Sequence, residues 1–180
     1  TKHFKENDNL YFVEFETNDT WARDCSALCV EEDKNIKLLD FTFTGWGGKF
    51  DAHKDNRMSR AISKHYSKEM ESVDFILEGG GVESNGKGII LSTSECLLNK
   101  NRNHSFTSEQ ITKKIEETLG ATEVLCLNHG YLVGDDTDSH IDTLARFIDE
   151  KTIMYVACPN IYDEHYKELK LMEEELQEMA

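Results

Sequence analysis

The feature that most constrains the fold is a strand–strand–helix pattern that recurs three times. Segments with helical spacing of apolar residues are centred near residues 63, 113 and 170, and each follows a pair of segments with strand patterning. A period of about 50 residues with this content is typical of blades arranged around an axis rather than of a doubly wound parallel sheet. The pattern therefore predicts an α+β chain of repeated ββα(β) units, about three of them, in a propeller-like assembly. An ordinary α+β sandwich with coincidental spacing is the alternative.

Local signals place the elements along the chain. Thr107 and Gln110 form a capping-box pattern at the start of a helix that Gly120 would end. Pro159 is the only proline and no Ser/Gly-rich linker interrupts the sequence, so residues 1–180 are expected to form a single domain. The predicted strands are 9–16, 26–32, 36–43, 73–77, 88–93, 123–127, 141–148 and 152–157, and the predicted helices are 56–70, 107–119 and 162–179.

The chain is strongly acidic, with 20 basic and 35 acidic residues among 180 and a formal net charge of −15. Such a charge repels nucleic acid and anionic lipid and favours a cationic ligand, although solubility alone also accounts for it. No stretch approaches the roughly 18 consecutive apolar residues of a membrane span. We therefore expect no nucleic-acid partner and no membrane partner. Five cysteines, an odd number without a C-x-x-C pair, favour reduced thiols in the cytoplasm.

Most glycines lie in short clusters, at 45–48, at 79–81 and within 130–134. None of the clusters matches a phosphate loop or a dinucleotide-binding fingerprint, so no cofactor is expected. Glycines at the ends of strands instead allow the backbone to approach a ligand closely. Polar residues beside them, such as Glu78, are then candidates for a shared cavity.

The run G-D-D-T-D-S-H-I-D at 134–142 holds the most informative side chains. Its carboxylates lack the calcium-loop pattern, and His140 has no second histidine or cysteine at zinc-ligand spacing, so no metal site is predicted. If His140 and Asp142 begin a strand, they point to one face because they lie two residues apart. A histidine beside a carboxylate keeps its proton near neutral pH, which suits general acid/base work. A turn cap with a hydrogen-bonded histidine is the structural alternative.

A second carboxylate, Asp24, follows Trp21-Ala22-Arg23 at the beginning of an apolar segment predicted to be a strand. Two carboxylates and an indole around one cavity suit a planar cation such as guanidinium. Such a cation takes bidentate hydrogen bonds at its nitrogens and lies against a π face. Alternatively, Trp21 is plain core and Arg23 neutralises Asp24. The pattern by itself leaves both interpretations open.

Five motifs follow one another in a fixed order: W-A-R-D at 21–24, G-W-G-G-K-F at 45–50, E-G-G at 78–80 with E-S-N-G-K-G at 83–88, C-L-L-N-K-N-R-N at 96–103, and the acidic run at 134–142. Together they resemble the agmatine deiminase and bacterial-type peptidylarginine deiminase family. The resemblance implies the pentein fold, a five-bladed pseudo-symmetric propeller of ββαβ units. It also implies hydrolysis of a guanidino group to a ureido group with release of ammonia.

The resemblance also implies roles for residues that match the motifs. Asp24 and Asp142 would hold the guanidinium nitrogens, and His140 would be the general acid/base. Because the resonance-stabilised guanidinium carbon is a poor electrophile, this chemistry also needs a thiolate nucleophile. The residues implied for the pocket wall, or for the support of the pocket or of His140, are Trp21, Glu78 and Asp136.

Two departures from the family pattern are visible. Ser26-Ala27 stands where the family usually has Gly-Pro, and Ser139 stands where it usually has glycine. The family carries its nucleophilic cysteine near the C-terminus after a glycine-rich strand, and none of the five cysteines here lies in such a motif. We therefore interpret the 180 residues as the central part of a longer enzyme that contains the carboxylates and the histidine but lacks the thiolate.

Three functions are compatible with this pattern. The leading hypothesis is deimination of agmatine to N-carbamoylputrescine, on a route to putrescine and other polyamines. The second is deimination of peptidyl or free arginine. The third, from another class, is a non-catalytic guanidinium-binding module. Each is compatible with a homo-oligomer.

Overall fold

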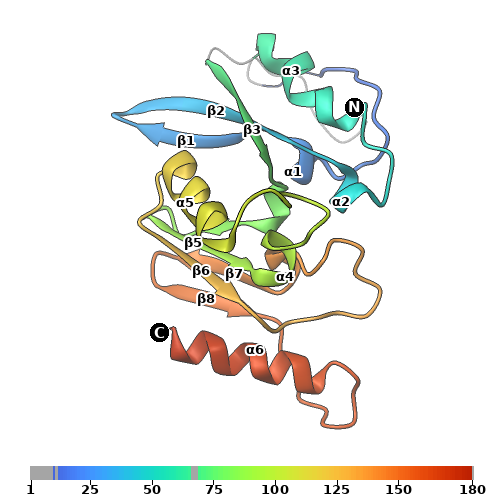
Figure 1. Cartoon of the computed structure of the whole chain (residues 1–180), viewed down its shortest axis with the longest axis vertical. Helices are drawn as coiled ribbons and strands as arrows, with labels where there is room; N and C mark the ends of the chain where they lie inside the picture. The colour runs from blue at the N-terminus through green and yellow to red at the C-terminus, as the bar shows by residue number, and fades with distance from the viewer. Residues whose placement is uncertain (1–9, 11, 66–68, 180) are drawn as a thin grey trace.

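The computed structural model describes residues 10, 12–65 and 69–179 and shows three sheets that follow one another along the chain (Figure 1). In the first repeat, β1 (Leu28–Glu32) pairs antiparallel with β2 (Asn35–Thr42). Strand β2 in turn pairs parallel with β3 (Met70–Ile76). The connection between β2 and β3 contains α2 (Gly45–Gly48), η1 (Asp55–Arg57), α3 (Met58–Ile62) and η2 (Ser63–His65).

The second repeat has the same order and the same pairing. Strand β4 (Glu83–Ser84) pairs antiparallel with β5 (Ile89–Thr93), and β5 pairs parallel with β6 (Glu123–Leu127). Two helices, α4 (Ser94–Leu97) and α5 (Ser108–Leu119), lie between the parallel strands. Repetition of one antiparallel and one parallel pairing confirms the ββαβ unit that the sequence predicted.

The third repeat begins with a hairpin. Strand β7 (Ala145–Asp149) pairs antiparallel with β8 (Thr152–Tyr155), and α6 (Tyr166–Glu178) follows. The three sheets are separate and successive, so the alternative of a single α+β sandwich is wrong. The chain is α+β, and its described part contains three repeats.

Helix α5 begins and ends as predicted. The Oγ1 atom of Thr107 accepts the N–H of Gln110, and the Gln110 amide oxygen accepts the N–H of Thr107. Gly120 follows with φ +68°, a conformation that glycine adopts without a steric penalty. Ile111 and Ile115 are buried one turn apart on the face toward the core.

Two predicted segments differ in the structure. Residues 10 and 12–16 form no strand, and residues 9 and 11 lie outside the described part. The chain that follows is held by a side chain, since the Asp55 carboxylate accepts the N–H groups of Asn18 and Asp19. The helix predicted over 56–70 is shortened to α3 because the Ser63 hydroxyl donates to a carbonyl of the last turn, and residues 66–68 are outside the described part.

Two apolar clusters form most of the core. One joins the first two sheets with α5, and the other packs α6 against β5, β6 and the segment before β7. A third, small cluster of Phe43, Trp46 and Ala52 lies around α2. In α6, Leu169, Met172 and Leu176 are buried along one face, each burial contributing about 1.5–3 kcal/mol. Within the described residues, no helix combines the length and the apolar character needed to cross a bilayer. The two larger clusters leave the loops between the repeats free to build a cavity.

Candidate active site

A cavity of about 840 Å³ opens where loops from different repeats meet. Its walls come from α1 (Ala22–Cys25), from the segment around α2, and from the loop between β6 and β7. Five of the six residues predicted for the site line this cavity, and the sixth, Glu78, contacts one of them, His140. The five are Trp21, Asp24, Asp136, His140 and Asp142.

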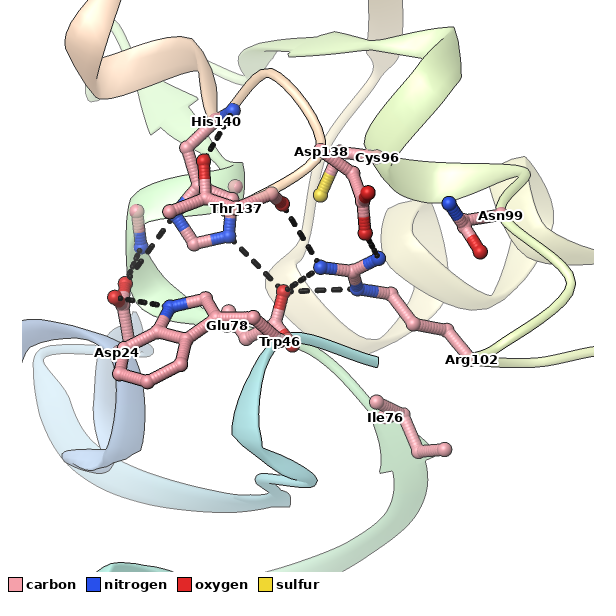
Figure 2. Close-up of polar contacts among 12 residues, drawn as sticks. Asp24, Trp46, Ile76, Glu78, Cys96, Asn99, Arg102, Thr137, Asp138 and His140 are labelled. Atoms are coloured by element: carbon pink, nitrogen blue, oxygen red, sulfur yellow. Dashed lines mark hydrogen bonds and ion pairs between the residues drawn. The ribbon is translucent and has the colours of Figure 1, made fainter. Parts of the chain in front are cut away.

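Asp24 lies in a single helical turn, α1, and the predicted strand position is wrong. Its own N–H bonds to the Trp21 carbonyl, so the chain turns before β1 begins. The carboxylate is 7% exposed, and both of its oxygens accept hydrogen bonds. Oδ1 accepts the Gly80 N–H at 2.8 Å, and Oδ2 accepts the indole N–H of Trp46 at 2.9 Å (Figure 2). Oδ1 also faces His140 Nδ1 at 3.5 Å, so Oδ2 is the oxygen that keeps a lone pair for a further donor.

Trp46 is a site residue that the sequence analysis missed. It belongs to the G-W-G-G-K-F motif at 45–50, for which no role was predicted. It is 4% exposed and has φ +55°, inside a run at 45–48 that is left-handed throughout. At Gly45 a Cβ atom would lie 2.2 Å from the Phe50 carbonyl oxygen, so only glycine fits there. A left-handed tryptophan costs about 1–2 kcal/mol, and backbone strain of this kind concentrates at functional sites. The signal in the sequence was a tryptophan enclosed by three glycines.

Gly80 is the point on which three predicted side chains converge. A Cβ atom at this position would lie 2.6 Å from Asp24 Oδ1, 2.6 Å from His140 Nδ1 and 2.9 Å from Asp142 Oδ2. Gly80 belongs to η3 (Gly79–Gly81), a tight turn directly after Glu78. The absence of a side chain here is what allows the two carboxylates and the imidazole to come together.

His140 precedes a 3-10 turn, η4 (Ile141–Thr143), so the predicted strand start is wrong at this position as well. The hydrogen bond from the Leu144 N–H to the Ile141 carbonyl curls the backbone before β7 begins. His140 is 1% exposed, with Nε2 at 3.0 Å from Glu78 Oε2 and Nδ1 at 3.5 Å from Asp24 Oδ1. Burial lowers the pKa of the imidazole, but Cys96, Glu78 and Asp24 outweigh it and raise that pKa to about 10.

The other predicted residues form the edge of the cavity. Burial raises the pKa of Asp142, His140 opposes this shift and the Asp24 charge adds to it. Trp21 is 64% exposed, so it is not plain core. Asp136 is exposed, with its carbonyl accepting a hydrogen bond from Lys49 Nζ, and no contact between its carboxylate and His140 is found among the described residues.

Arg102 is the second residue that the sequence analysis missed. Its guanidinium donates from Nε to Glu78 Oε2 at 2.8 Å and from Nη1 to Asp138 Oδ2 at 2.7 Å. Nη2 donates to the Thr137 carbonyl at 3.0 Å (Figure 2). Burial alone would lower the pKa of Arg102, but Cys96, Glu78 and Asp138 outweigh this effect and raise the pKa above its ordinary value. The guanidinium is therefore always charged. The sequence signal was an arginine inside a motif that had no assigned role.

The sequence pattern of the Porphyromonas-type peptidyl-arginine deiminase family matches this chain over residues 1–180. The chain belongs to this family. A curated relative, agmatine deiminase from Stutzerimonas stutzeri, is 32% identical over 168 residues, which is 89% of this chain and 45% of the relative.

Solved structures of related proteins match this chain over a similar share of its length. A Cys-to-Ser variant of agmatine deiminase from C. jejuni, solved with substrate bound, has a TM-score of 0.91 and 46% identity, covering 96% of this chain and 52% of that protein. Agmatine deiminase of Enterococcus faecalis has a TM-score of 0.85 and 28% identity, covering 92% of this chain and 47% of that protein. The fold expected from the family, the α+β pentein fold, is therefore confirmed. The chain spans about half the length of these peptidyl-arginine deiminase family members.

Two of the five thiols of this family member are held in the form that does not act as a nucleophile. Burial, with the charges of Asp55 and Asp24, raises the pKa of Cys25 to about 11, and burial raises that of Cys126. Cys96 is buried in α4 and belongs with Glu78 and His140 to the one group of the described residues that could hold a metal ion. A cation there would compete with the Arg102 guanidinium for the same carboxylate oxygen.

Proposed function

We propose that the whole protein containing this chain hydrolyses the guanidino group of agmatine, giving N-carbamoylputrescine and ammonia. The observation that supports this most is the convergence of Asp24, His140 and Asp142 on the backbone of Gly80 in one cavity. Two carboxylates with room for a planar cation between them match guanidinium. The relatives named agmatine deiminase support the choice of substrate.

Each side chain has a distinct part in the proposed reaction. Asp24 and Asp142 accept hydrogen bonds from the guanidinium nitrogens and fix the plane of the group for attack. Trp21 and Asp136 form the outer wall of the pocket, and Glu78 supports the imidazole. His140 stays protonated at neutral pH because its neighbours raise its pKa, so it is ready to donate.

The chemistry proceeds in two balanced steps. A cysteine thiolate forms a bond to the guanidinium carbon, and the C–N bond to one terminal nitrogen breaks as that nitrogen takes a proton from His140 and leaves as ammonia. The resulting thiouronium carbon is attacked by water, which gives a proton to the now neutral His140. The C–S bond then breaks and restores the thiolate, while the new hydroxyl group loses its remaining proton to solvent, which leaves a neutral ureido product.

The thiolate is proposed to come from a segment beyond these 180 residues. Cys25 and Cys126 are held as thiols, and neither Cys25, Cys96 nor Cys126 is among the residues that line the cavity. The C. jejuni agmatine deiminase with substrate bound carries a Cys-to-Ser change, which is consistent with a cysteine acting in catalysis in that protein. The chain alone is accordingly proposed to be inactive.

Deimination of peptidyl or free arginine is a second candidate, and one observation favours it. Arg23 and Arg146 line the same cavity as Asp24 and Asp142. A cationic side chain there would attract the carboxylate of an arginine and repel the distal ammonium of agmatine. Among the described residues, Arg23 donates to the Val82 carbonyl and forms no ion pair with Asp24, whereas Arg146 is paired with Glu83 at 3.2 Å, so Arg23 is the better candidate for this contact.

The setting of the enzyme completes the proposal. We place it in the cytoplasm as a homo-oligomer, with residues 1–180 forming one unit of its fold. Its product would enter putrescine and polyamine synthesis. A non-catalytic guanidinium-binding role stays as the alternative from another class.

The test is ammonia release by the whole protein, with agmatine and with a peptide ending in arginine. Asp24→Asn and Asp142→Asn should each lower kcat/KM by about 100-fold or more, since each removes a charge-assisted bond to the substrate in a partly dry pocket. Asp74→Asn, an exposed carboxylate on β3, should change it less than about twofold. Agmatine binding without ammonia release would favour the non-catalytic module, and equal losses in all three variants would point to folding instead.

A further inference from the structure

An ion network that is buried at Arg102 and Glu78 and reaches the surface through Asp138 and Lys49 lies behind His140. The side chains of Arg102 and Glu78 are 2% and 0% exposed, and that of Asp138 is 13% exposed. Burying such charges costs several kcal/mol per ion before their attraction is counted, and apolar residues of similar size often serve stability as well. A network of this kind, placed in contact with the histidine of a candidate active site, therefore calls for a role beyond stability.

The Arg102 guanidinium joins two parts of the chain that must meet at His140. On one side, Nε and Nη2 both contact Oε2 of Glu78, at 2.8 and 2.6 Å, and this same oxygen lies 3.0 Å from His140 Nε2. On the other side, Nη1 and Nη2 bind Asp138 and Thr137, in the turn that leads into His140. One planar group thus fixes both the partner of the imidazole and the backbone that carries it.

The orientation of Glu78 depends on this contact. Its Oε1 atom is buried and has no hydrogen-bond partner among the described residues, so the polar contacts found for the carboxylate fall on Oε2. Without the guanidinium, the contact with His140 would be the one that remains on Oε2. The Glu78 carboxylate could then rotate and move away from the imidazole. The turn is also strained: Asp138 and Ser139 have φ +65° and +60°.

We propose that Arg102 is a positioning residue of the deimination reaction, which fixes Glu78 and the turn at 137–140 so that the His140 imidazole lies between Glu78 and Asp24. The inference rests on the proposed function, in which His140 moves the protons. Arginine suits this task because its planar fork binds two carboxylates at once, whereas the ammonium of lysine is a single point charge on a flexible stem.

The test compares Arg102→Lys with a matched control in the whole protein. Arg102→Lys should lower kcat for agmatine by about 100-fold and leave KM within about threefold, since the carboxylates that bind the substrate are untouched. Arg60→Lys changes another arginine whose Nε binds a buried carboxylate, Asp40, but at a distance from the cavity, and should leave kcat within about twofold. Normal kcat in a folded Arg102→Lys protein would overturn the proposal.

A second readout does not depend on turnover. Proton and nitrogen NMR of His140 in the substrate-free protein should show a pKa that falls from about 10 toward the ordinary value for histidine in Arg102→Lys, because the Glu78 contact is lost. The groups that face the imidazole besides Arg102 and Glu78 are Asp24 of α1, Cys96 of α4 and Asp142 of η4. An unchanged or higher His140 pKa would mean that Glu78 holds its position alone, and would overturn the inference.

The two measurements separate this inference from the proposed function. If the unchanged protein releases no ammonia from any guanidino compound, the proposed function fails, while the NMR titration still decides whether Arg102 positions His140. If Arg102→Lys does not fold, Asp138→Asn weakens the arm of the network that reaches the turn, together with the ion pair of Asp138 with Lys49 at 2.6 Å, and leaves the contact between Arg102 and Glu78 in place. It should then give the same direction of change in kcat, with KM preserved. Normal kcat in Asp138→Asn would contradict the role of the turn.

Discussion

Three site side chains lie close to the backbone of Gly80, so even substitution of this glycine by alanine should disturb them. Gly80 has no left-handed φ, and alanine would therefore fit its backbone. Its Cβ would nevertheless lie under 3.0 Å from Asp24, His140 and Asp142, closer than real Cβ atoms approach. The added methyl group would push the groups proposed to hold the substrate out of alignment.

We expect Gly80→Ala in the whole protein to lower kcat/KM for agmatine by about 100-fold or more, as misplacement by about 1 Å near a reacting centre does. The neighbouring Gly81→Ala is the matched control, since the atoms nearest to its Cβ would be Cys96 Sγ at 3.1 Å and the His140 ring at 3.8 Å, none of them closer than 3.0 Å. Steady-state kinetics of both variants check this. A Gly80→Ala enzyme as active as Gly81→Ala would contradict the convergence of the three side chains on this glycine.

Ser139 shows what the sequence could and could not reveal about a single residue. The comparison with the family noted serine in place of glycine, and the structure gives the physical meaning: φ at Ser139 is +60°, where glycine is preferred. The chemical types of the site residues were readable because carboxylates and histidine suit guanidinium chemistry. Arg102 and Trp46 were not, because their importance comes from contacts with residues distant in sequence.

At the scale of elements, the best predictions concern those whose signals are local. Helix α5 carries its own capping box and its own terminal glycine, and both are found where expected. The strand starts predicted at Asp24 and His140 were wrong. Each segment makes a tight turn stabilised by backbone hydrogen bonds, and the spacing of apolar residues does not encode such turns. The strand predicted over 9–16 failed because alternation of apolar residues indicates a strand only where a partner strand is available.

We expect the stability of the protein to depend on pH because of His140, the residue before η4. Because the pKa of His140 is raised from 6.5 to about 10 in the folded protein, its contribution is fully present below pH 6.5 and is lost as the pH rises toward 10. The free energy of unfolding of the unchanged protein should thus fall, relative to His140→Gln, by on the order of 2 kcal/mol between pH 6.5 and pH 9. Denaturant unfolding at several pH values measures this, and a difference that stays constant across the range would show that His140 is not held protonated.

At the scale of the whole molecule, the repeat was readable from the sequence, whereas the pairing of the site residues with one another was not. Each helix and each strand has its own spacing of apolar residues, so three units with the same sequence of strands and helices can be counted. The cavity, however, joins Asp24 to a glycine 56 residues away and Glu78 to a histidine 62 residues away. No local pattern encodes such pairings, and only the resemblance to a family pointed to them.

The account as a whole proposes that these residues bind and protonate a guanidino substrate while the nucleophile lies elsewhere. The most direct measurement is the intact mass of the whole protein, quenched during turnover of agmatine and then digested to locate the modified residue. We expect a cysteine outside residues 1–180 to gain the mass of agmatine less ammonia, as a thiouronium intermediate requires. The same adduct on Cys25, Cys29, Cys96, Cys126 or Cys158, or turnover in a protein whose other cysteines are all replaced by serine, would contradict it.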